Sequence, residues 1–545
     1  MAIETPFSKL QALVVDDSPA QLSTLRGQLQ MLGIKRVDGA SHADDALRQV
    51  RAGKYNLILC DYNLNHRTDG QQLFEYLRDN NLLAPDCLFF MVTAENAYAN
   101  VAAASEHKPD AYLLKPFTAA DVEERLKAAA ERRKVFEPVT AALGRNDLPA
   151  ALAAADQLLQ KKDRWQLQAQ QQKAQILLGL GRHADARALY QAALDERPQL
   201  VWAQIGLARS LKAGNLFEEA RQQAQKIIDS PDGQRNLAAY DVLAESLEAL
   251  GDAHGAQAVL RDAVAAVPSA RRQRMLAEAA FRNGAHETAM DAMAKVLKAT
   301  QGALTAQPQD TLTLAQAMVD SGQAPQALAL LDQSNAKLAA APQVESVALA
   351  IRAQALVATG DADGAQKAVA RARETLRVAK ADFATVALAK AELAAGNEEA
   401  GLQLLSAAVS ADHENPRVKQ LVRNALRVAG HEAKTDSIVE SAAAGLQVRV
   451  VGAKTLFRDS RIDEALAAIE AALADFPDNT GVLLQAAQMH CMALRLKKQA
   501  NPPMVERVRL YLSRLDRLMP GNDRVTQMQR YFRETLATLS EPVPA

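Results

Sequence analysis

The sequence predicts an α/β domain built on a parallel sheet, followed by a long array of paired helices. Two observations carry this prediction. Over the first 130 residues, short apolar runs alternate with stretches in which Leu and Ala recur at helical spacing, which is typical of a doubly wound sheet. Beyond residue 138, a pattern of small residues recurs, with a spacing of 34 residues in the best-matched copies. Such a period indicates stacked helical repeats.

Five strands are expected in the first domain, and each is a short run of strand-forming residues, such as LQALVV in the first. Continuous apolar runs suit strands that are buried on both faces of a sheet. Because helical segments separate them, all five strands are expected to run parallel. The expected strands lie at 10–15, 34–40, 55–60, 87–93 and 111–115.

Helices are expected between these strands and after the last one. The first is followed by Gly33, which suits a helix C-cap. Thr118 and Asp121 form a capping-box pattern that opens the last helix, which is expected to run through Arg133 toward Phe136 and to stop before Pro138. The earlier helices are expected at 19–32, 42–52, 70–79 and 96–107.

Composition narrows the class of protein. The chain is 49% hydrophobic but only 4% aromatic, which favours stacked Ala/Leu helices, and its net charge of −1 gives no reason to bind nucleic acid. The three cysteines show no CxxC spacing, so a reducing compartment is expected. No apolar run reaches the roughly 18 residues of a membrane span, and no signal peptide is evident. We therefore expect a cytoplasmic protein without membrane contact.

Acidic residues follow two of the expected strands. Asp16 and Asp17 come directly after the first strand, and Asp61 follows the third. The carboxyl ends of parallel strands meet at one edge of an open α/β sheet, where such sheets bind their ligands. Three carboxylates placed together repel one another unless a cation is present, and oxygen ligands with room for water suit Mg²⁺. The sequence predicts a magnesium site there.

A hydroxyl and a lysine complete this candidate site. Thr93 ends the fourth strand and can hydrogen-bond a phosphoryl oxygen, while Lys115 follows the fifth strand and can reach the same group as a point charge. Asp61 would then be the nucleophile that accepts a phosphoryl group, with the metal neutralising charge on the transferring group.

Residues 10–130 resemble the receiver domain of two-component response regulators. The acidic pair of that family matches Asp16 and Asp17, its phosphoacceptor matches Asp61, its switch hydroxyl matches Thr93, and its lysine matches Lys115. The resemblance implies a flavodoxin-like strand order and a metal ligand from a backbone carbonyl.

Further positions of the family match as well. The carbonyl ligand would come from Asn63, the proline after the lysine is Pro116, whose peptide bond is cis in the family, and the aromatic switch residue is Tyr112. By analogy, phosphorylation draws Thr93 inward and lets Tyr112 rotate into the vacated space. Asn63 and Glu95 occupy the two positions that tune dephosphorylation in the family, and this pair suggests a short-lived phosphoryl state.

The loop after Asp61 departs from the family pattern. Asn65 stands where the family usually has proline, and Gly70 lies about one residue late. We therefore expect the geometry of the loop that bears Asn63 to differ.

The array resembles tetratricopeptide repeats, about ten of them, with a helix at 522–538 as a polar cap. A small residue recurs on the second helix of each pair, at Ala151, Ala186, Ala220, Ala256, Ala289, Ala327, Ala365, Gly401 and Ala465, with a weaker copy at Thr435. The resemblance implies a concave groove that binds peptides or protein segments. Trp165 and Trp202 lie either in that groove or in the core. The pattern is weakest at 430–440 and 492–505.

These observations predict a receiver domain at 1–130 and a helical array at 131–545. The chain is interpreted as a two-component response regulator that takes a phosphoryl group from a sensor histidine kinase and acts by binding a protein or peptide through the array. The alternatives are a phosphorylation-independent assembly scaffold and a phosphate sink for a shared kinase. The face of helix 4, strand 5 and helix 5 could also support a homodimer. DNA-binding and enzymatic outputs are disfavoured, because no motif for either occurs.

Overall fold

The computed structural model describes residues 7–64, 68–80, 82–84, 87–94, 109–145, 147–231, 233–267, 269–303, 305–376, 380–412, 415–497, 501–519 and 523–540. The chain divides into two compact units. Unit 1 comprises 1–250, 255–273 and 295–307, and unit 2 comprises 251–254, 274–294 and 308–545.

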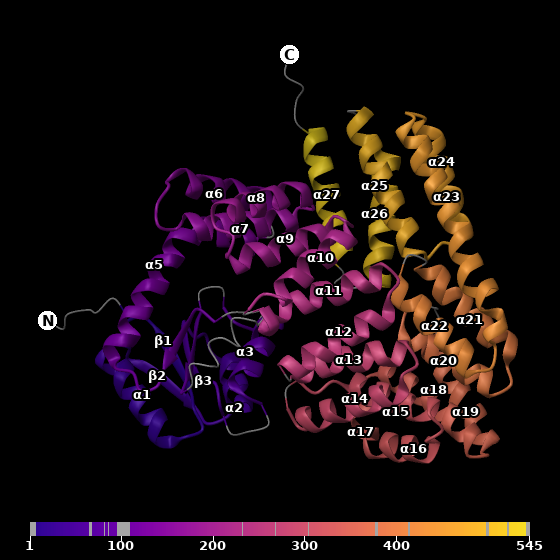
Figure 1. The fold of residues 1–545 in the computed structure, drawn as a ribbon, viewed down its shortest axis with the longest axis horizontal. Helices are drawn as coiled ribbons and strands as arrows, with labels where there is room; N and C mark the ends of the chain where they lie inside the picture. The colour runs from indigo at the N-terminus through magenta and orange to yellow at the C-terminus, as the bar shows by residue number, and fades with distance from the viewer. Residues whose placement is uncertain are drawn as a thin grey trace. The chain divides into compact units, whose positions relative to one another are not determined.

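The N-terminal part of unit 1 is a five-stranded parallel sheet (Figure 1). Its strand order is β2-β1-β3-β4-β5, and every pair of neighbours is parallel. This confirms the predicted fold class and the flavodoxin-like order. The strands are β1 (Gln11–Val15), β2 (Arg36–Ala40), β3 (Leu57–Asp61), β4 (Leu88–Thr93) and β5 (Ala111–Leu114).

Helices cover both faces of the sheet because its side chains alternate between two apolar cores. Helices α1 (Pro19–Met31) and α5 (Ala119–Gly144) pack on one face, and α2 (Ala43–Ala52) and α3 (Gly70–Asp79) pack on the other. Gly33 closes α1 with a φ of 88°, and the capping box of Thr118 and Asp121 is present. The helix expected at 96–107 lies outside the described residues.

The last helix of the sheet domain is longer than predicted. It runs from Ala119 to Gly144, and Pro138 lies inside it, so the expected stop before the proline was wrong. A proline inside a helix removes one backbone hydrogen bond, but the continuing turns bury Val139 and Ala142 in the core of the first repeat. Packing of these turns outweighs the local cost. Helix α5 thereby crosses residue 130, and the predicted domain boundary there stays a prediction.

The rest of the described chain is helical. Its α-helices are α6 (Leu148–Gln160), α7 (Gln166–Gly179), α8 (His183–Glu196), α9 (Val201–Ala213), α10 (Phe217–Ile228), α11 (Leu237–Ala249), α12 (Ala253–Ala266), α13 (Ala270–Arg282), α14 (His286–Thr300), α15 (Pro308–Asp320), α16 (Ala324–Gln333), α17 (Asn335–Leu338), α18 (Pro342–Ala358), α19 (Ala362–Thr375), α20 (Phe383–Ala394), α21 (Glu398–Ala411), α22 (Pro416–Val428), α23 (Ser441–Arg458), α24 (Ile462–Asp475), α25 (Thr480–Lys497), α26 (Pro502–Leu518) and α27 (Asp523–Ser540).

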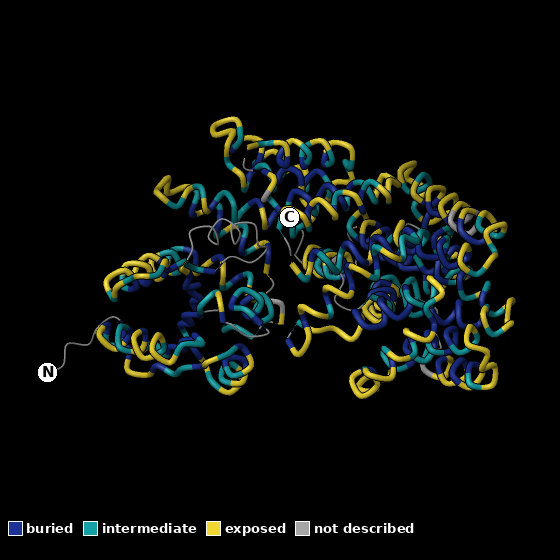
Figure 2. The backbone as a smooth tube through the Cα atoms, turned by 60° about the horizontal axis from the view of Figure 1, so that its bottom comes forward, coloured by how far each residue is buried: buried dark blue, intermediate teal, exposed yellow. Residues whose placement is uncertain are grey.

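The recurring small residues lie where the helices of a pair meet. All the alanines of the predicted pattern are buried, as is Gly401, and Figure 2 shows buried backbone along the inner side of the paired helices. The pattern is interrupted where expected. Around Thr435 a 3₁₀ turn (Glu432–Lys434) and a π turn (Asp436–Glu440) replace the second α-helix of a pair.

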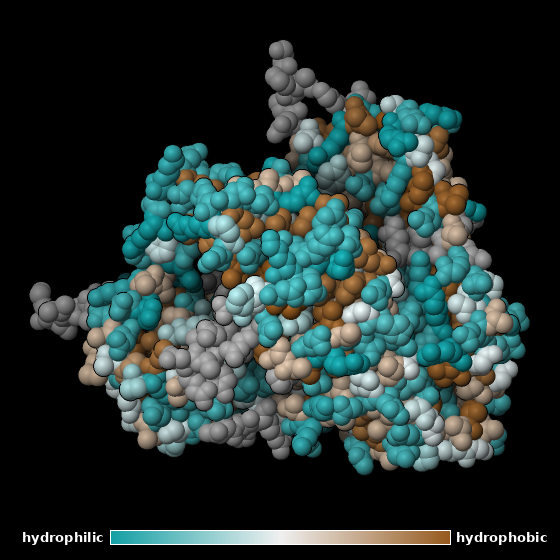
Figure 3. All heavy atoms as spheres, in the orientation of Figure 1, coloured by the Kyte–Doolittle hydropathy of each residue, from teal (hydrophilic) through white to brown (hydrophobic). Residues whose placement is uncertain are grey.

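The surface of the described part of the chain is mixed. Hydrophilic residues cover most of the face shown in Figure 3, with smaller hydrophobic areas between them. None of the described helices is both long and apolar enough to cross a bilayer.

One glycine shows how tightly the repeats pack. Gly206 of α9 lies against the ring of Tyr190 of α8, and a Cβ atom at residue 206 would lie 2.1 Å from that ring. We expect Gly206→Ala to lower the free energy of unfolding of the array by about 1–3 kcal/mol, because the buried ring must move. Urea unfolding followed by circular dichroism measures this change.

The matched control is Gly452→Ala, because residue 452 is exposed in the middle of α23 and a Cβ there meets nothing within 4 Å. Gly452→Ala should raise the free energy of unfolding by about 0.5–1 kcal/mol, because alanine has a higher helix propensity than glycine. Equal effects at the two glycines would contradict the close approach of Tyr190.

Candidate functional site

The parallel register of the sheet brings the acidic residues together. Val15 of β1 pairs with Cys60 of β3, so the residues that follow them leave the sheet at the same edge. One carboxylate oxygen from each of Asp16, Asp17 and Asp61 lies within 4.8 Å of the others. The structure thus places these three predicted site residues side by side.

Lys115 lies between two of these carboxylates. Its Nζ donates hydrogen bonds to Asp16 Oδ2 at 3.0 Å and to Asp61 Oδ2 at 2.9 Å. Lys115 directly follows β5, and its bond to Pro116 is cis, which the resemblance implied. Thr93 ends the neighbouring strand β4 and is only 2% exposed. The residues predicted from four strand ends therefore converge at one edge of the sheet.

Burial sets the electrostatics of the site. The pKa of Asp61 is raised, chiefly because burial removes its charge from water, and Asp16 adds repulsion while Lys115 opposes the shift. Burial alone would lower the pKa of Lys115, but its hydrogen bonds to Asp61 and Asp16 outweigh burial and raise it. Lys115 therefore stays protonated at neutral pH, and the site holds one positive charge among three carboxyl groups.

The donor set fits a hard divalent cation. All side-chain ligands at the edge are carboxylate oxygens, which Mg²⁺ prefers. The backbone N–H of Asn63 donates to the Asp61 carboxylate, so the chain after β3 stays close to the site. A dication there would offset the charge that Lys115 leaves unbalanced.

The loop between β3 and α3 is closed by a glycine that cannot easily be replaced. The Gly70 N–H donates to the Tyr62 carbonyl at 2.8 Å, and a Cβ atom at residue 70 would lie 2.0 Å from the Asp61 carbonyl oxygen. Although Gly70 comes late in the sequence, it packs directly on the backbone of the predicted phosphoacceptor. Asn65 lies outside the described residues, so the expected change in loop geometry stays a prediction there.

Asp69, beside Gly70, is a residue that the sequence analysis missed. Its side chain accepts the Gln72 N–H at 2.7 Å and caps α3. Burial raises the pKa of this carboxyl to about 6. The Asp69 and Gln72 pair, three residues apart, is a capping-box pattern that could have identified it.

Tyr112, the predicted switch residue, lies on the side of β5 that faces α3. It packs against the same apolar core as Tyr62 and Tyr76. Its hydroxyl is buried and has no hydrogen-bond partner in the described part of the chain. Burial, and then the neighbouring Tyr62 and Glu75, raise its pKa. Glu95, which was expected to tune dephosphorylation, lies outside the described residues.

Comparison with models of protein families agrees with this arrangement of residues. Residues 12–127 match the model of the response regulator receiver domain. Residues 12–127 form a response regulator receiver domain. Behind this receiver domain, tetratricopeptide repeat models match residues 139–201, 177–240 and 242–303. These matches confirm the resemblance to a receiver domain followed by tetratricopeptide repeats.

Two relatives are similar to part of this chain. The chain is 28% identical over 178 residues to the alkaline phosphatase synthesis transcriptional regulatory protein PhoP of Bacillus subtilis, which covers 31% of this chain and 71% of that protein. It is also 28% identical over 127 residues to the chemotaxis protein CheY-3 of Vibrio cholerae, which covers 23% of this chain and 93% of that protein.

Two solved structures are also similar to this chain. One is a tetratricopeptide repeat protein from Parabacteroides merdae, with a TM-score of 0.30, 13% identity, and coverage of 45% of this chain and 93% of that one. The other is Naa15/Naa10 bound to HypK-THB, with a TM-score of 0.27, 16% identity, and coverage of 76% and 69%.

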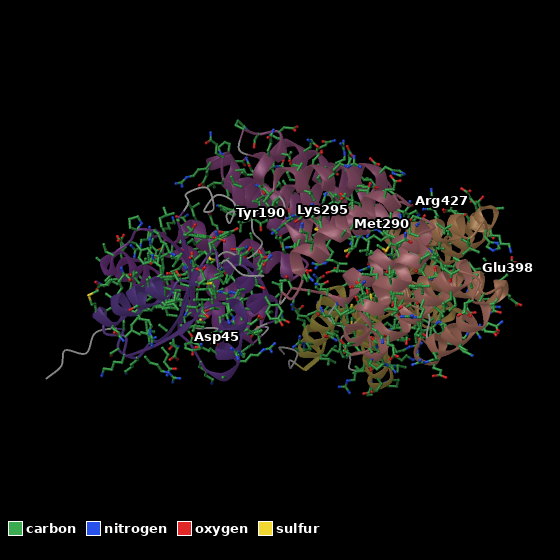
Figure 4. All side chains as sticks on the ribbon, turned by 90° about the horizontal axis from the view of Figure 1, so that it is seen from below. Asp45, Tyr190, Met290, Lys295, Glu398 and Arg427 are labelled. Carbon is green, nitrogen blue, oxygen red and sulfur yellow. The ribbon has the colours of Figure 1, made fainter. Side chains whose placement is uncertain are left out.

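In unit 2 of the array, the first helices of several pairs pack on one another. The rings of Phe281 (α13) and Phe383 (α20) lie 5.8 Å apart, and Asn424 of α22 donates to the Phe281 carbonyl at 3.1 Å. Arg427, labelled in Figure 4, donates in turn to Asn424 Oδ1. The cavity among these helices is only about 10 Å³, room for one water molecule. The helices are therefore closely packed around Phe281 and Asn424.

Buried polar groups fill that interior. The Gln316 and Gln354 side chains are hydrogen-bonded to each other, Lys390 pairs with Asp320, and the side chains of both pairs are buried. The two tryptophans of unit 1 are both partly buried. Trp165 lies edge-on to Phe136, and Trp202 lies edge-on to Tyr190, so each is packed at the margin of a core.

The contact of Gly70 with Asp61 yields a test. We expect Gly70→Ala to slow phosphorylation of the chain by acetyl phosphate by about 10- to 100-fold, because the added methyl group displaces the Asp61 backbone. Gly39→Ala in β2 is the control, since a Cβ there meets only ordinary contacts at 3.7 Å or more, and it should react at the wild-type rate. Equal rates for the two variants would show that the Asp61 backbone tolerates the methyl group.

The raised pKa of Asp61 gives the site a pH dependence. A raised pKa means that protons compete with Mg²⁺ for this carboxylate at a higher pH than for an ordinary aspartate. Lowering the pH from about 7.5 to about 5.5 should therefore weaken Mg²⁺ binding, as measured by calorimetry. Asp61→Asn removes this competing proton, so its weaker Mg²⁺ binding should vary less over the same range. An equally steep dependence in both proteins would assign the effect to another group.

Proposed function

We propose that this protein is a two-component response regulator that acts in the cytoplasm and accepts a phosphoryl group at Asp61 from a sensor histidine kinase. The observation that carries the proposal is the bridging of Asp61 and Asp16 by Lys115 within a cluster of three carboxylates. An ordinary buried ion pair needs only one carboxylate. Two further acidic groups beside it, at the open edge of a parallel sheet, suit a site for a dication and a phosphoryl group.

Each residue has a distinct role in the proposed transfer. An Asp61 carboxylate oxygen forms a bond to phosphorus as the bond from phosphorus to the kinase histidine nitrogen breaks, and the bonding pair returns to the imidazole. Lys115 stabilises the transferred oxygens from the side of β5, and Thr93 donates a hydrogen bond to one of them. Asp16, Asp17, Asp61 and the Asn63 carbonyl would hold Mg²⁺, which supplies neutralising charge when bound.

Output is proposed to run through the helical array to a protein or peptide partner. The support is the family of the repeats and the receiver domain before them. The space around Phe281 and Asn424 is closed, whereas a pocket of about 400 Å³ lies between α15, α18 and the start of α20. In the receiver domain, Thr93 and Tyr112 are proposed to act as the switch pair, and their approach on phosphorylation would reshape the neighbouring surface.

Partner capture from the source organism's lysate tests this function. Immobilised protein with Mg²⁺ is incubated with or without beryllofluoride, a mimic of the phosphoryl group, and Asp61→Ala with beryllofluoride serves as the matched control. We expect at least one partner whose yield changes with beryllofluoride in the wild type and does not change in the variant. The same partners in all three arms would contradict gating and favour a scaffold. Rapid phosphoryl turnover with no state-dependent partner would instead favour a phosphate sink.

A further inference from the structure

Strand β5 lies at the edge of the sheet and is held at both ends by charged side chains. Its one strand neighbour is β4, and it spans only the four residues Ala111–Leu114. At its carboxyl end, Lys115 reaches Asp16 and Asp61. An edge strand of this length can shift while breaking a single hydrogen-bond ladder, so β5 is the strand best placed to move when the state of Asp61 changes.

The other end of β5 is held by Asp110, which directly precedes the strand. Its Oδ1 accepts a hydrogen bond from Arg132 Nη2 at 2.6 Å, and its Oδ2 accepts the Phe89 N–H of β4 at 3.0 Å. The Asp110 side chain is 9% exposed, and Arg78 lies 3.9 Å away on its other side. The Arg132 side chain is 38% exposed, so salt screens this pair less than a fully exposed ion pair but does not leave it unscreened.

Arg132 belongs to the part of α5 that joins the array. The next residue, Arg133, donates to the Cys87 carbonyl at 2.6 Å. One turn further on, Phe136 packs in the core of the first repeat. The ring of Trp165, at the start of α7, lies 6.1 Å from the Phe136 ring. A shift at Arg132 therefore reaches the first repeat within one turn of helix.

We propose that β5 acts as a strut which transmits the state of Asp61 to the first repeat pair through the ion pair of Asp110 and Arg132. The inference rests on the proposed phosphorylation of Asp61, because a phosphoryl group there changes what Lys115 binds. The new phosphoryl oxygens compete for Lys115, β5 adjusts along β4, and Asp110 carries the adjustment to α5. By linkage, the packing of α5 on the array then alters the affinity of the receiver domain for a noncovalent mimic of the phosphoryl group such as beryllofluoride.

The fluorescence of Trp165 reports directly on the contact between α5 and the first repeat. The chain has two tryptophans, so Trp202→Phe leaves Trp165 as the sole tryptophan. In that background, Mg²⁺ with beryllofluoride should shift the fluorescence of Trp165. Adding Asp110→Asn keeps an acceptor for the Phe89 N–H but removes the charge that holds Arg132. This variant should still bind beryllofluoride, as measured by ¹⁹F NMR, but lose the fluorescence shift.

A control variant and a second test variant complete the experiment. Lys127→Gln removes an exposed ion pair with Glu123 from the same helix without touching the sheet, and it should keep the shift. Arg132→Gln removes the charged partner of Asp110 on α5 and keeps the hydrogen bond from the Phe89 N–H to Asp110. It should behave like Asp110→Asn, and circular dichroism identifies any variant that has not folded.

The outcomes separate this inference from the proposed function. The strut is supported if all the proteins bind beryllofluoride and the fluorescence shift occurs in the background protein and in Lys127→Gln. The shift must be absent from Asp110→Asn and Arg132→Gln. The strut is wrong if Asp110→Asn and Arg132→Gln bind beryllofluoride and keep the full fluorescence shift. It is also wrong if the background protein binds beryllofluoride without any shift. Both outcomes leave the phosphoacceptor role intact. If the background protein binds no beryllofluoride, both the strut and the proposed function are wrong.

Discussion

The repulsion among three carboxylates at one edge of the sheet is the constraint on which the receiver domain depends. Asp16, Asp17 and Asp61 are brought together by strand register, and without a cation their charges would drive the strand ends apart. Lys115 supplies one positive charge and in doing so ties β5 to β1 and β3. The same ammonium group that balances the site therefore also links the edge strand to it.

This arrangement makes the chemistry and the structure of the domain inseparable. Any group that enters the site must satisfy the Lys115 ammonium or displace it, because that ammonium is the partner of two carboxylates, of which Asp16 is buried and Asp61 is partly exposed. Gly70 acts on the other side of Asp61, where only a residue without a side chain fits against the backbone. The Asp61 carboxylate is thus positioned from two directions, by charge on one side and by close packing on the other.

The sequence was most informative where function and strand ends coincide. Asp61, Thr93 and Lys115 each stand at the end of an apolar run, and parallel topology alone brings such residues together. The Asp110 and Arg132 pair could not be predicted in this way, because no local pattern links residues 22 positions apart. Pro138 misled for a related reason: its local cost in a helix was visible in the sequence, but the packing that outweighs it was not. The contact of Asn424 with Phe281 joins residues 143 apart, and a repeat pattern cannot specify such closure.

The continuity of α5 has a consequence for how this chain can be divided or recombined. Val122 and Leu126 lie in the core of the sheet domain, while Phe136 and Val139 of the same helix lie in the core of the first repeat. A cut between Ala129 and Val135 would leave each core its own residues, but it would end the helix that fixes the orientation of one core relative to the other. A chimera that grafts a different receiver onto this array must therefore import the donor's helix in frame with the first repeat. Even a single-residue insertion within α5 would rotate one core relative to the other by about 100°, one residue's share of a 3.6-residue helical turn.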